Sequence, residues 1–169
     1  MDLEEALASL KAQLLPITEV EHCALQHCRG RVLAKPVTAK LSLPPFRASA
    51  MDGYAIQAGK HDQLLTVIGE SLAGHPFQGD IGPEECVRIF TGALVPANAG
   101  QIILQEEVAE REGNQVRFNA HTPSESYIRP IGNDLKLGSQ IADQGDVLHP
   151  FLMGSLSGAG VSSGECFRS

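Results

Sequence analysis

The feature that most constrains the fold is a series of short apolar segments, separated by turn-forming residues, in the middle of this 169-residue chain. Each segment is rich in Val, Ile or Phe, and Gly, Pro, Asn and Asp stand between the segments. This spacing is typical of a β-rich domain with frequent turns, because β-branched and aromatic residues favour strands and Gly and Pro interrupt them. Strands are predicted at 53–57, 64–69, 86–91, 101–108, 115–119 and 126–131.

Two connections between these strands have their own signals. The stretch 71–85 holds too many Gly and Pro residues for a regular element, so it is predicted to be a loop around the sheet. Glu112, Gly113 and Asn114 stand between two apolar runs and predict a hairpin turn in which Gly113 or Asn114 adopts a positive φ angle.

The two ends of the chain are more helical in pattern. Residues 2–14 place Leu and Ala at helical spacing, with Asp2 as the N-cap and Glu5 in a capping-box position. The apolar stretch near 148–161 predicts a second helix, which needs a partner to cover Phe151 and Leu156. The N-terminal helix is the candidate partner.

These patterns predict a fold that is mainly β with short helices. Residues 1–40 and 137–165 are expected to form one small helical and extended domain, and residues 41–136 a β-rich domain inserted into it. Residues 166–169 are expected to be a disordered tail.

Composition excludes several classes of protein. A net charge of -7 and a pI near 5.3 argue against a partner with a phosphate backbone, since nucleic-acid modules carry basic surfaces. The acidic N-terminus is not a signal peptide, and no apolar run has the length of a membrane span. Four cysteines without a CxxC pair fit a reducing compartment, so a cytoplasmic location is expected.

The most informative stretch is LSLPPFRASAMDGYAI, residues 41–56. By turn chemistry alone, Asp52-Gly53 is a turn former, because Gly accepts positive φ and Asp bonds the turn backbone. The string PPFRASAMDGYA, however, resembles the signature of the MoeA/gephyrin family of molybdopterin molybdotransferases. Further resemblance follows in the family's order at GRVLA (30–34), RIFTGALVP (88–96) and IRPIGNDLKLG (128–138).

The resemblance implies a fold and a reaction. The fold is a β-rich domain of coiled, bifurcated sheets that interrupts an elongated helical element. The reaction is the insertion of molybdate into adenylylated molybdopterin, with release of AMP in a step that requires Mg²⁺. Family members are homodimers whose site lies between this β-rich domain and the later domains of the other subunit, and they work with other proteins of cofactor synthesis.

The resemblance also implies site residues. Asp52, Thr91 and Asp134 match the family's catalytic positions, and the two carboxylates are hard oxygen ligands suited to Mg²⁺. The Thr91 hydroxyl can hydrogen-bond an oxyanion without adding repulsive charge. Apart from the resemblance, Asp134 is equally well interpreted as an acidic turn residue and Thr91 as a residue at the end of a strand. The substrate-binding positions implied are Ser49, Gly53, Gly92 and Arg129.

The sequence departs from the family in two respects. Arg129 and Asp134 are the basic and acidic side chains left in a loop that is richer in arginine elsewhere in the family. The motifs of the later molybdopterin-binding domain, T-G-D-E, G-G-x-S and P-G-N-P, do not occur, nor is a later C-terminal β domain expected. The chain alone is therefore expected to be inactive. The alternative is a non-catalytic binding or dimerisation module of the same family.

Three other patterns are weaker. His22-Cys23 and His27-Cys28 offer zinc ligands, but a five-residue spacing does not hold one helical face, so buried structural cysteines are favoured. Glu106 is interpreted as a solvated strand end. Ser162 lies in a G-x-S-x-G string, which indicates a hydrolase only with a strand before it and a helix after it.

Overall fold

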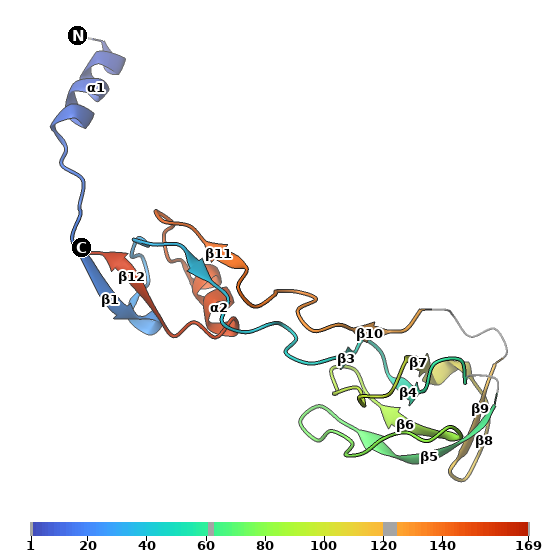
Figure 1. Cartoon of the computed structure of the whole chain (residues 1–169). Helices are drawn as coiled ribbons and strands as arrows, with labels where there is room; N and C mark the ends of the chain where they lie inside the picture. Colours follow the sequence, from blue (N-terminus) through green and yellow to red (C-terminus); the bar gives the residue numbers. More distant parts are fainter. Residues whose placement is uncertain (1, 61–62, 120–124, 169) are drawn as a thin grey trace. The chain divides into compact units, whose positions relative to one another are not determined.

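The structure is a computed structural model that describes residues 2–60, 63–119 and 125–168 (Figure 1). The chain forms two compact units. Unit 1 consists of Met1–Lys40 and Leu137–Ser169, and unit 2 of Leu41–Lys136. Strands dominate the described residues, which confirms the expected fold class of mainly β with short helices.

Unit 2 is built on a six-stranded sheet of order β7-β4-β6-β5-β9-β8. Only β5 and β6 pair in parallel among these strands, and the loop that joins them covers the expected stretch after residue 71. The elements are β3 (Ala48–Ser49), β4 (Gly53–Ile56), β5 (Leu64–Ser71), β6 (Glu85–Ile89), β7 (Gln101–Leu104), the 3-10 turn η2 (Gln105–Glu107), β8 (Val108–Glu112), β9 (Gln115–Phe118) and β10 (Ile128–Arg129).

The central strands of this sheet are buried on both faces. Alternate residues of a strand point to opposite faces, and Tyr54 and Ile56 belong to one apolar cluster while Ala55 belongs to another. The same division separates Ile102 from Ile103. Strand β4 can therefore be apolar along its whole length, GYAI, without exposing a face.

In unit 2 the structure confirms the predicted hairpin turn but differs from the predicted strands in where they begin and end. The β8–β9 hairpin is confirmed, and Gly113 has a φ of 56°. The strand expected over 101–108 is instead two strands separated by η2, and of 126–131 only β10 is a strand.

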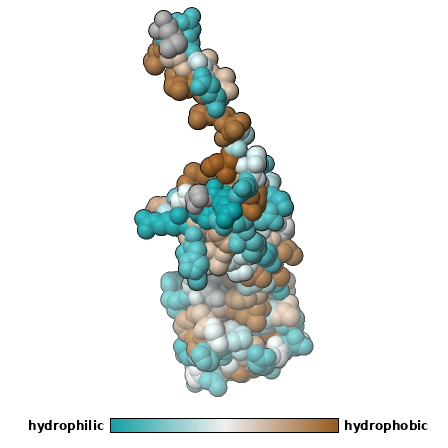
Figure 2. All heavy atoms as spheres, turned by 90° about the vertical axis from the view of Figure 1, so that its left-hand side faces the viewer, coloured by the Kyte–Doolittle hydropathy of each residue, from teal (hydrophilic) through white to brown (hydrophobic). Residues whose placement is uncertain are grey.

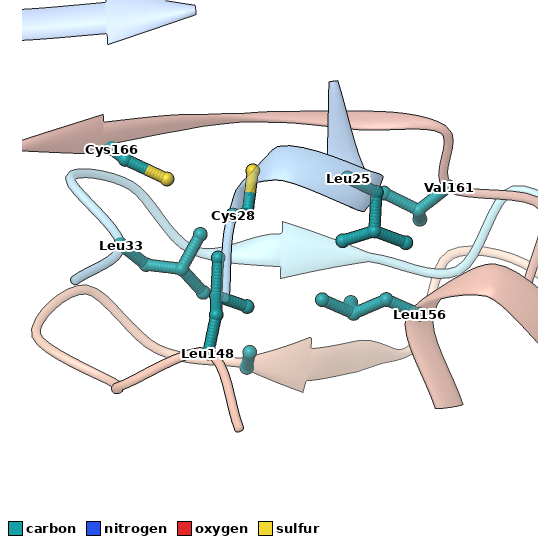
Figure 3. Packing of buried hydrophobic residues seen from close by; sticks show 8 residues of the cluster. Leu25, Cys28, Leu33, Leu148, Leu156, Val161 and Cys166 are labelled. Carbon is teal, nitrogen blue, oxygen red and sulfur yellow. The ribbon is translucent and has the colours of Figure 1, made fainter. Parts of the chain in front are cut away.

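The described residues of unit 1 form two small antiparallel sheets and two helices. Strand β1 pairs with β12, and β2 pairs with β11. The elements are α1 (Leu3–Gln13), β1 (Val20–Ala24), the 3-10 turn η1 (Leu25–His27), β2 (Val37–Thr38), β11 (Gln140–Ala142), α2 (Pro150–Gly158) and β12 (Ser163–Phe167). Its core packs Leu25, Leu33, Leu148 and Leu156 together with buried cysteines (Figure 3).

The expected disordered tail at 166–169 is wrong for the residues that the structure describes. Cys166 and Phe167 lie in β12, with Cys166 fully buried, and Arg168 forms an ion pair with Glu19. Ser169 lies outside the described residues. Local pattern does not indicate this strand, because its partner β1 lies near the other end of the chain.

Helix α1 begins as predicted, but it does not cover α2. Asp2 caps it and Glu5 completes the capping box. None of its residues is buried, and the leucines along it are exposed (Figure 2). Helix α2 instead anchors Leu156 in the core of unit 1 and leaves Phe151 86% exposed. No helix among the described residues is long and apolar enough to cross a membrane.

Candidate functional site

Asp52 and Thr91 form a tight pair on unit 2. Asp52 precedes β4, and Thr91 follows β6. The Oδ1 atom of Asp52 accepts hydrogen bonds from the backbone N–H and from the hydroxyl of Thr91, both at 2.7 Å. These bonds, the backbone bond most of all, hold the pKa of Asp52 below its ordinary value. Asp52 is therefore a carboxylate at neutral pH.

This pairing changes what Thr91 can do. A threonine hydroxyl has one proton, and here that proton is donated to Asp52. In this arrangement the hydroxyl presents lone pairs, so it acts as an acceptor or a neutral oxygen ligand. The expected hydrogen bond to an oxyanion would require the hydroxyl to leave Asp52.

Three of the expected substrate-binding residues surround this pair, with different exposure. Ser49 is 1% exposed, and its hydroxyl donates to the carbonyl of Met51 at 2.5 Å. Gly53 is buried, and a Cβ at that position would lie 2.0 Å from the Ile103 carbonyl oxygen. Ser49 thus holds the backbone of Met51 and Gly53 packs closely against β7, and their role in substrate binding stays a prediction. Gly92 is exposed, with a φ of 81° and open space around its α-carbon.

Arg129 and Asp134 form a second pair. The Nη2 atom of Arg129 donates to both carboxylate oxygens of Asp134, at 2.6 and 2.5 Å, and Asn133 donates to Oδ1 at 3.0 Å. The hydrogen bond from Arg129 is the main reason that the pKa of Asp134 is lowered. The guanidinium has five N–H donors, so it retains donors for an anion beyond those that serve Asp134.

Strand β3 connects the two pairs. Ser49 donates its N–H to Ala93 and accepts from the N–H of Gly92, which fixes the loop that carries Thr91. On the same short strand, Ala48 pairs with Arg129 and Ser49 with Ile128. The structure thus joins, through one strand, the motifs at 41–56, 88–96 and 128–138.

Arg88 is a neighbour that the sequence did not single out. Its guanidinium donates to the Gly53 carbonyl at 2.9 Å and to the Gln105 side chain at 2.5 Å, and it lies over the Tyr54 ring, 5.0 Å from the centroid. Its charge also contributes to the lowered pKa of Asp52. Arg88, Tyr54, Gln105, Val108 and Arg111 line a cavity of about 310 Å³. A basic residue within an otherwise apolar predicted strand was the available signal.

The two acidic residues differ in how well they suit a metal ion. Thr91 occupies Oδ1 of Asp52, so Oδ2 and the Thr91 hydroxyl oxygen are hard donors of the kind that Mg²⁺ prefers. Asp134 has both oxygens in hydrogen bonds with Arg129, whose positive charge disfavours a neighbouring cation. The surroundings of Asp134 therefore do not fit the expected Mg²⁺ ligand, whereas those of Asp52 do.

The weaker candidates are placed in ordinary positions. Glu106 is exposed in η2, as interpreted from the sequence. Ser162 follows α2 and precedes β12, which reverses the strand and helix order that a nucleophile elbow requires. His22 and His27 are both exposed.

The fold and the arrangement of these motifs are those of one protein family. Residues 1–160 match the family described as MoeA N-terminal region (domain I and II), and the chain belongs to this family. Its members among curated proteins include a molybdopterin molybdenumtransferase of Haemophilus influenzae, 34% identical over 99% of this chain and 42% of that protein. A molybdopterin molybdenumtransferase of Synechococcus elongatus is 33% identical over 95% of this chain and 41% of its own length.

Solved structures agree with this assignment. A molybdopterin biosynthesis MoeA protein from Pyrococcus horikoshii superposes with a TM-score of 0.83 at 26% identity, covering 100% of this chain and 44% of that one. A second structure of MoeA from the same organism gives 0.81 at 31% identity, over 96% of this chain and 45% of its own. The chain spans less than half the length of these relatives.

Proposed function

We propose that this chain supplies the N-terminal part of a site that inserts molybdate into the dithiolene of adenylylated molybdopterin and releases AMP. The family match over residues 1–160 supports this proposal, as do relatives named molybdopterin molybdenumtransferase. The single observation that carries it in the structure is the Asp52–Thr91 pair, held in place by Ser49 and a glycine that tolerates no side chain.

The proposed roles follow from charge. Bound Mg²⁺ would supply positive charge beside the phosphate and molybdate oxygens, which repel a carboxylate. Asp52, ionised at neutral pH, would hold that ion through Oδ2 or through its water, and the Thr91 hydroxyl oxygen would add a neutral contact. Gly92 would let an anion approach the backbone, and Arg129 would donate its remaining N–H groups to an anionic oxygen.

In this proposal the remaining parts of the site come from outside residues 1–169, since the matched relatives are more than twice as long as the region they share with this chain. A homodimer is the proposed assembly, and other proteins of molybdenum cofactor synthesis are the proposed partners. In this proposal residues 1–169 supply only part of the site, so by themselves they do not catalyse the reaction.

A chimera tests the proposal. Residues 1–160 would replace the matched region of the Haemophilus influenzae relative, and molybdate-dependent AMP release from adenylylated molybdopterin would be measured. We expect activity in the chimera, and a loss of at least about 100-fold with Asp52→Asn, comparable to removal of one electrostatic catalytic group. Glu106→Gln is the control, because it also removes one exposed negative charge near β7.

A folded chimera without activity would refute the catalytic proposal and would favour a binding or dimerisation module. An active chimera in which Asp52→Asn has no effect would leave the family function intact but would remove Asp52 from the site.

A further inference from the structure

Unit 1 contains a cluster of three cysteines that the molybdenum site does not use. Cys23 lies on β1, Cys28 follows η1, and Cys166 lies on β12. Their sulfur atoms all lie within 4.8 Å of one another. Within the described residues this is the one group of three or more Cys, His, Asp or Glu ligands at such separations. Figure 3 shows the sulfur of Cys166 directed toward the side of Cys28.

The strand register explains how residues so distant in sequence meet. Cys23 pairs with Gly164 and Glu21 with Cys166, so Cys23 and Cys166 are diagonal neighbours on one face of the β1–β12 ladder. The turn η1 then brings Cys28 back beneath β1, where its thiol donates to the Ala24 carbonyl at 3.2 Å. Cys28 and Cys166 are fully buried, and Cys23 is half-buried.

Alternation along β1 also decides which residues are absent from the cluster. Adjacent residues of a strand point to opposite faces, and His22, next to Cys23, is exposed. His27 is exposed as well, and its ring contacts the Gln26 side chain at 3.1 Å. The two His-Cys pairs therefore contribute their sulfur atoms to one site, and Cys166 replaces the imidazoles.

Arg31 supplies positive charge at the edge of this cluster. Its Nη1 atom lies 3.6 Å from the Cys23 sulfur, and its side chain is only 17% exposed. Its Nη2 atom donates to Glu21 and to the Phe167 carbonyl, whereas its buried Nε has no hydrogen-bond partner in the described structure. Arg31 therefore places a positive charge beside the sulfur atoms of the cluster.

We propose that Cys23, Cys28 and Cys166 form a zinc-binding site with three thiolate ligands and a fourth position open to water at Cys23. Zinc prefers thiolates in a tetrahedral arrangement, and zinc–sulfur bonds of about 2.3 Å place sulfur atoms roughly 4 Å apart. The cluster is thus within about an ångström of ligand geometry. Zn²⁺ with three thiolates carries one negative charge, which Arg31 faces.

Binding must displace protons. Burial raises the pKa of Cys28 to about 12 and also raises the pKa of Cys166. Each thiol that binds Zn²⁺ releases its proton to solvent, so three protons leave per ion bound.

The test uses the whole chain, reduced and freed of metal, with Zn²⁺ as the probe. Competition against a chromophoric chelator should show one Zn²⁺ per chain, and Co²⁺ in its place should give the absorption of a tetrahedral thiolate complex. Cys23→Ser, at the half-buried position, should weaken Zn²⁺ binding at least about 100-fold, more than a change outside the ligands does. Cys86→Ser is the matched control, because Cys86 is a buried cysteine of unit 2 outside the cluster.

Three results would overturn the proposal. The first is a folded, reduced chain that binds no Zn²⁺, and the second is binding that Cys23→Ser leaves unchanged. The third is a disulfide among the three cysteines that persists in mild reductant and excludes the ion. Circular dichroism of Cys23→Ser distinguishes loss of a ligand from loss of the fold.

Discussion

Thr91 donates both its backbone N–H and its hydroxyl to the same oxygen of Asp52, each at 2.7 Å. Two donors on one oxygen restrict the orientation of the carboxylate, and both bonds engage Oδ1 and not Oδ2. Charge and geometry at Asp52 therefore depend on Thr91, although the two residues are 39 positions apart in sequence.

Replacing Thr91 should change the pKa of Asp52 in a graded way. Thr91→Val keeps the backbone donor and removes the hydroxyl, so the pKa of Asp52 should rise part of the way toward its ordinary value of 3.8. Thr91→Ser, which keeps the hydroxyl, is the control and should leave the pKa where it is. Carboxyl ¹³C chemical shifts followed against pH measure both. Equal pKa values in all three proteins would show that the hydroxyl bond is not formed in solution.

Gly53 should tolerate no larger residue. A Cβ at this position would lie 2.0 Å from the Ile103 carbonyl oxygen, which is backbone of the neighbouring strand β7 and cannot rotate away. We expect Gly53→Ala to lower the free energy of unfolding by about 2 kcal/mol or more, since overpacking costs roughly 1–3 kcal/mol. Urea unfolding gives the value.

Gly82→Ala is the control within the same unit. The nearest atoms to a Cβ there belong to the flexible Glu85 side chain, which can move. Its loss of stability should be clearly smaller, and equal losses for the two variants would mean that the β4–β7 contact is looser than the structure shows.

The Arg129–Asp134 pair should stabilise unit 2 only above acidic pH. The folded protein lowers the pKa of Asp134, so the stabilisation is present above the ordinary carboxyl pKa and is lost as the pH falls through the lowered folded value. Asp134→Asn should thus cost more stability at pH 7 than at strongly acidic pH.

A double-mutant cycle with Arg129→Gln isolates the pair in urea unfolding experiments. The coupling should be small and should decrease with added salt, because both side chains are substantially exposed. A coupling that does not change with pH would contradict the ion pair.

Truncating two residues of α2 should cost very different amounts of stability. Leu156 is buried in the core of unit 1, so Leu156→Ala should cost about 2–5 kcal/mol. Phe151 is 86% exposed, and Phe151→Ala should change stability by no more than about 0.5 kcal/mol. Thermal and urea unfolding of the two variants provide the comparison. A large loss at Phe151 would reveal a packing partner for that ring.

The sequence predicted best where a signal acts over a few residues. The Asp2–Glu5 capping box and the Gly113 hairpin are both local, and the structure confirms both. Cys166 and Phe167 were expected to be disordered because their strand exists only by pairing with β1, a partner that local pattern does not identify.

The same limit applies to the candidate site. The motifs that carry Asp52, Thr91 and Asp134 were found by resemblance, but the chemistry between side chains was not. Spacing alone could not show that the Thr91 hydroxyl donates a hydrogen bond to Asp52, that Arg129 donates to Asp134, or that Ser49 is buried. Arg88 acts through contacts with Gly53 and Gln105, which only the folded sheet creates.

Paired backbone segments on both sides of the boundary between the units have a consequence for folding order. Leu43 and Leu135 exchange hydrogen bonds in unit 2, and Ala39 bonds Gly138 and Ser139 in unit 1. Before unit 2 folds, the two halves of unit 1 are the ends of one long flexible loop, whose closure costs entropy. Once unit 2 has folded, the hydrogen bonds between Leu43 and Leu135 keep the two chain segments of unit 1 close together. Unit 1 should therefore fold second. In pulsed hydrogen exchange, amides of β4 and β6 should then be protected before those of β1 and β12.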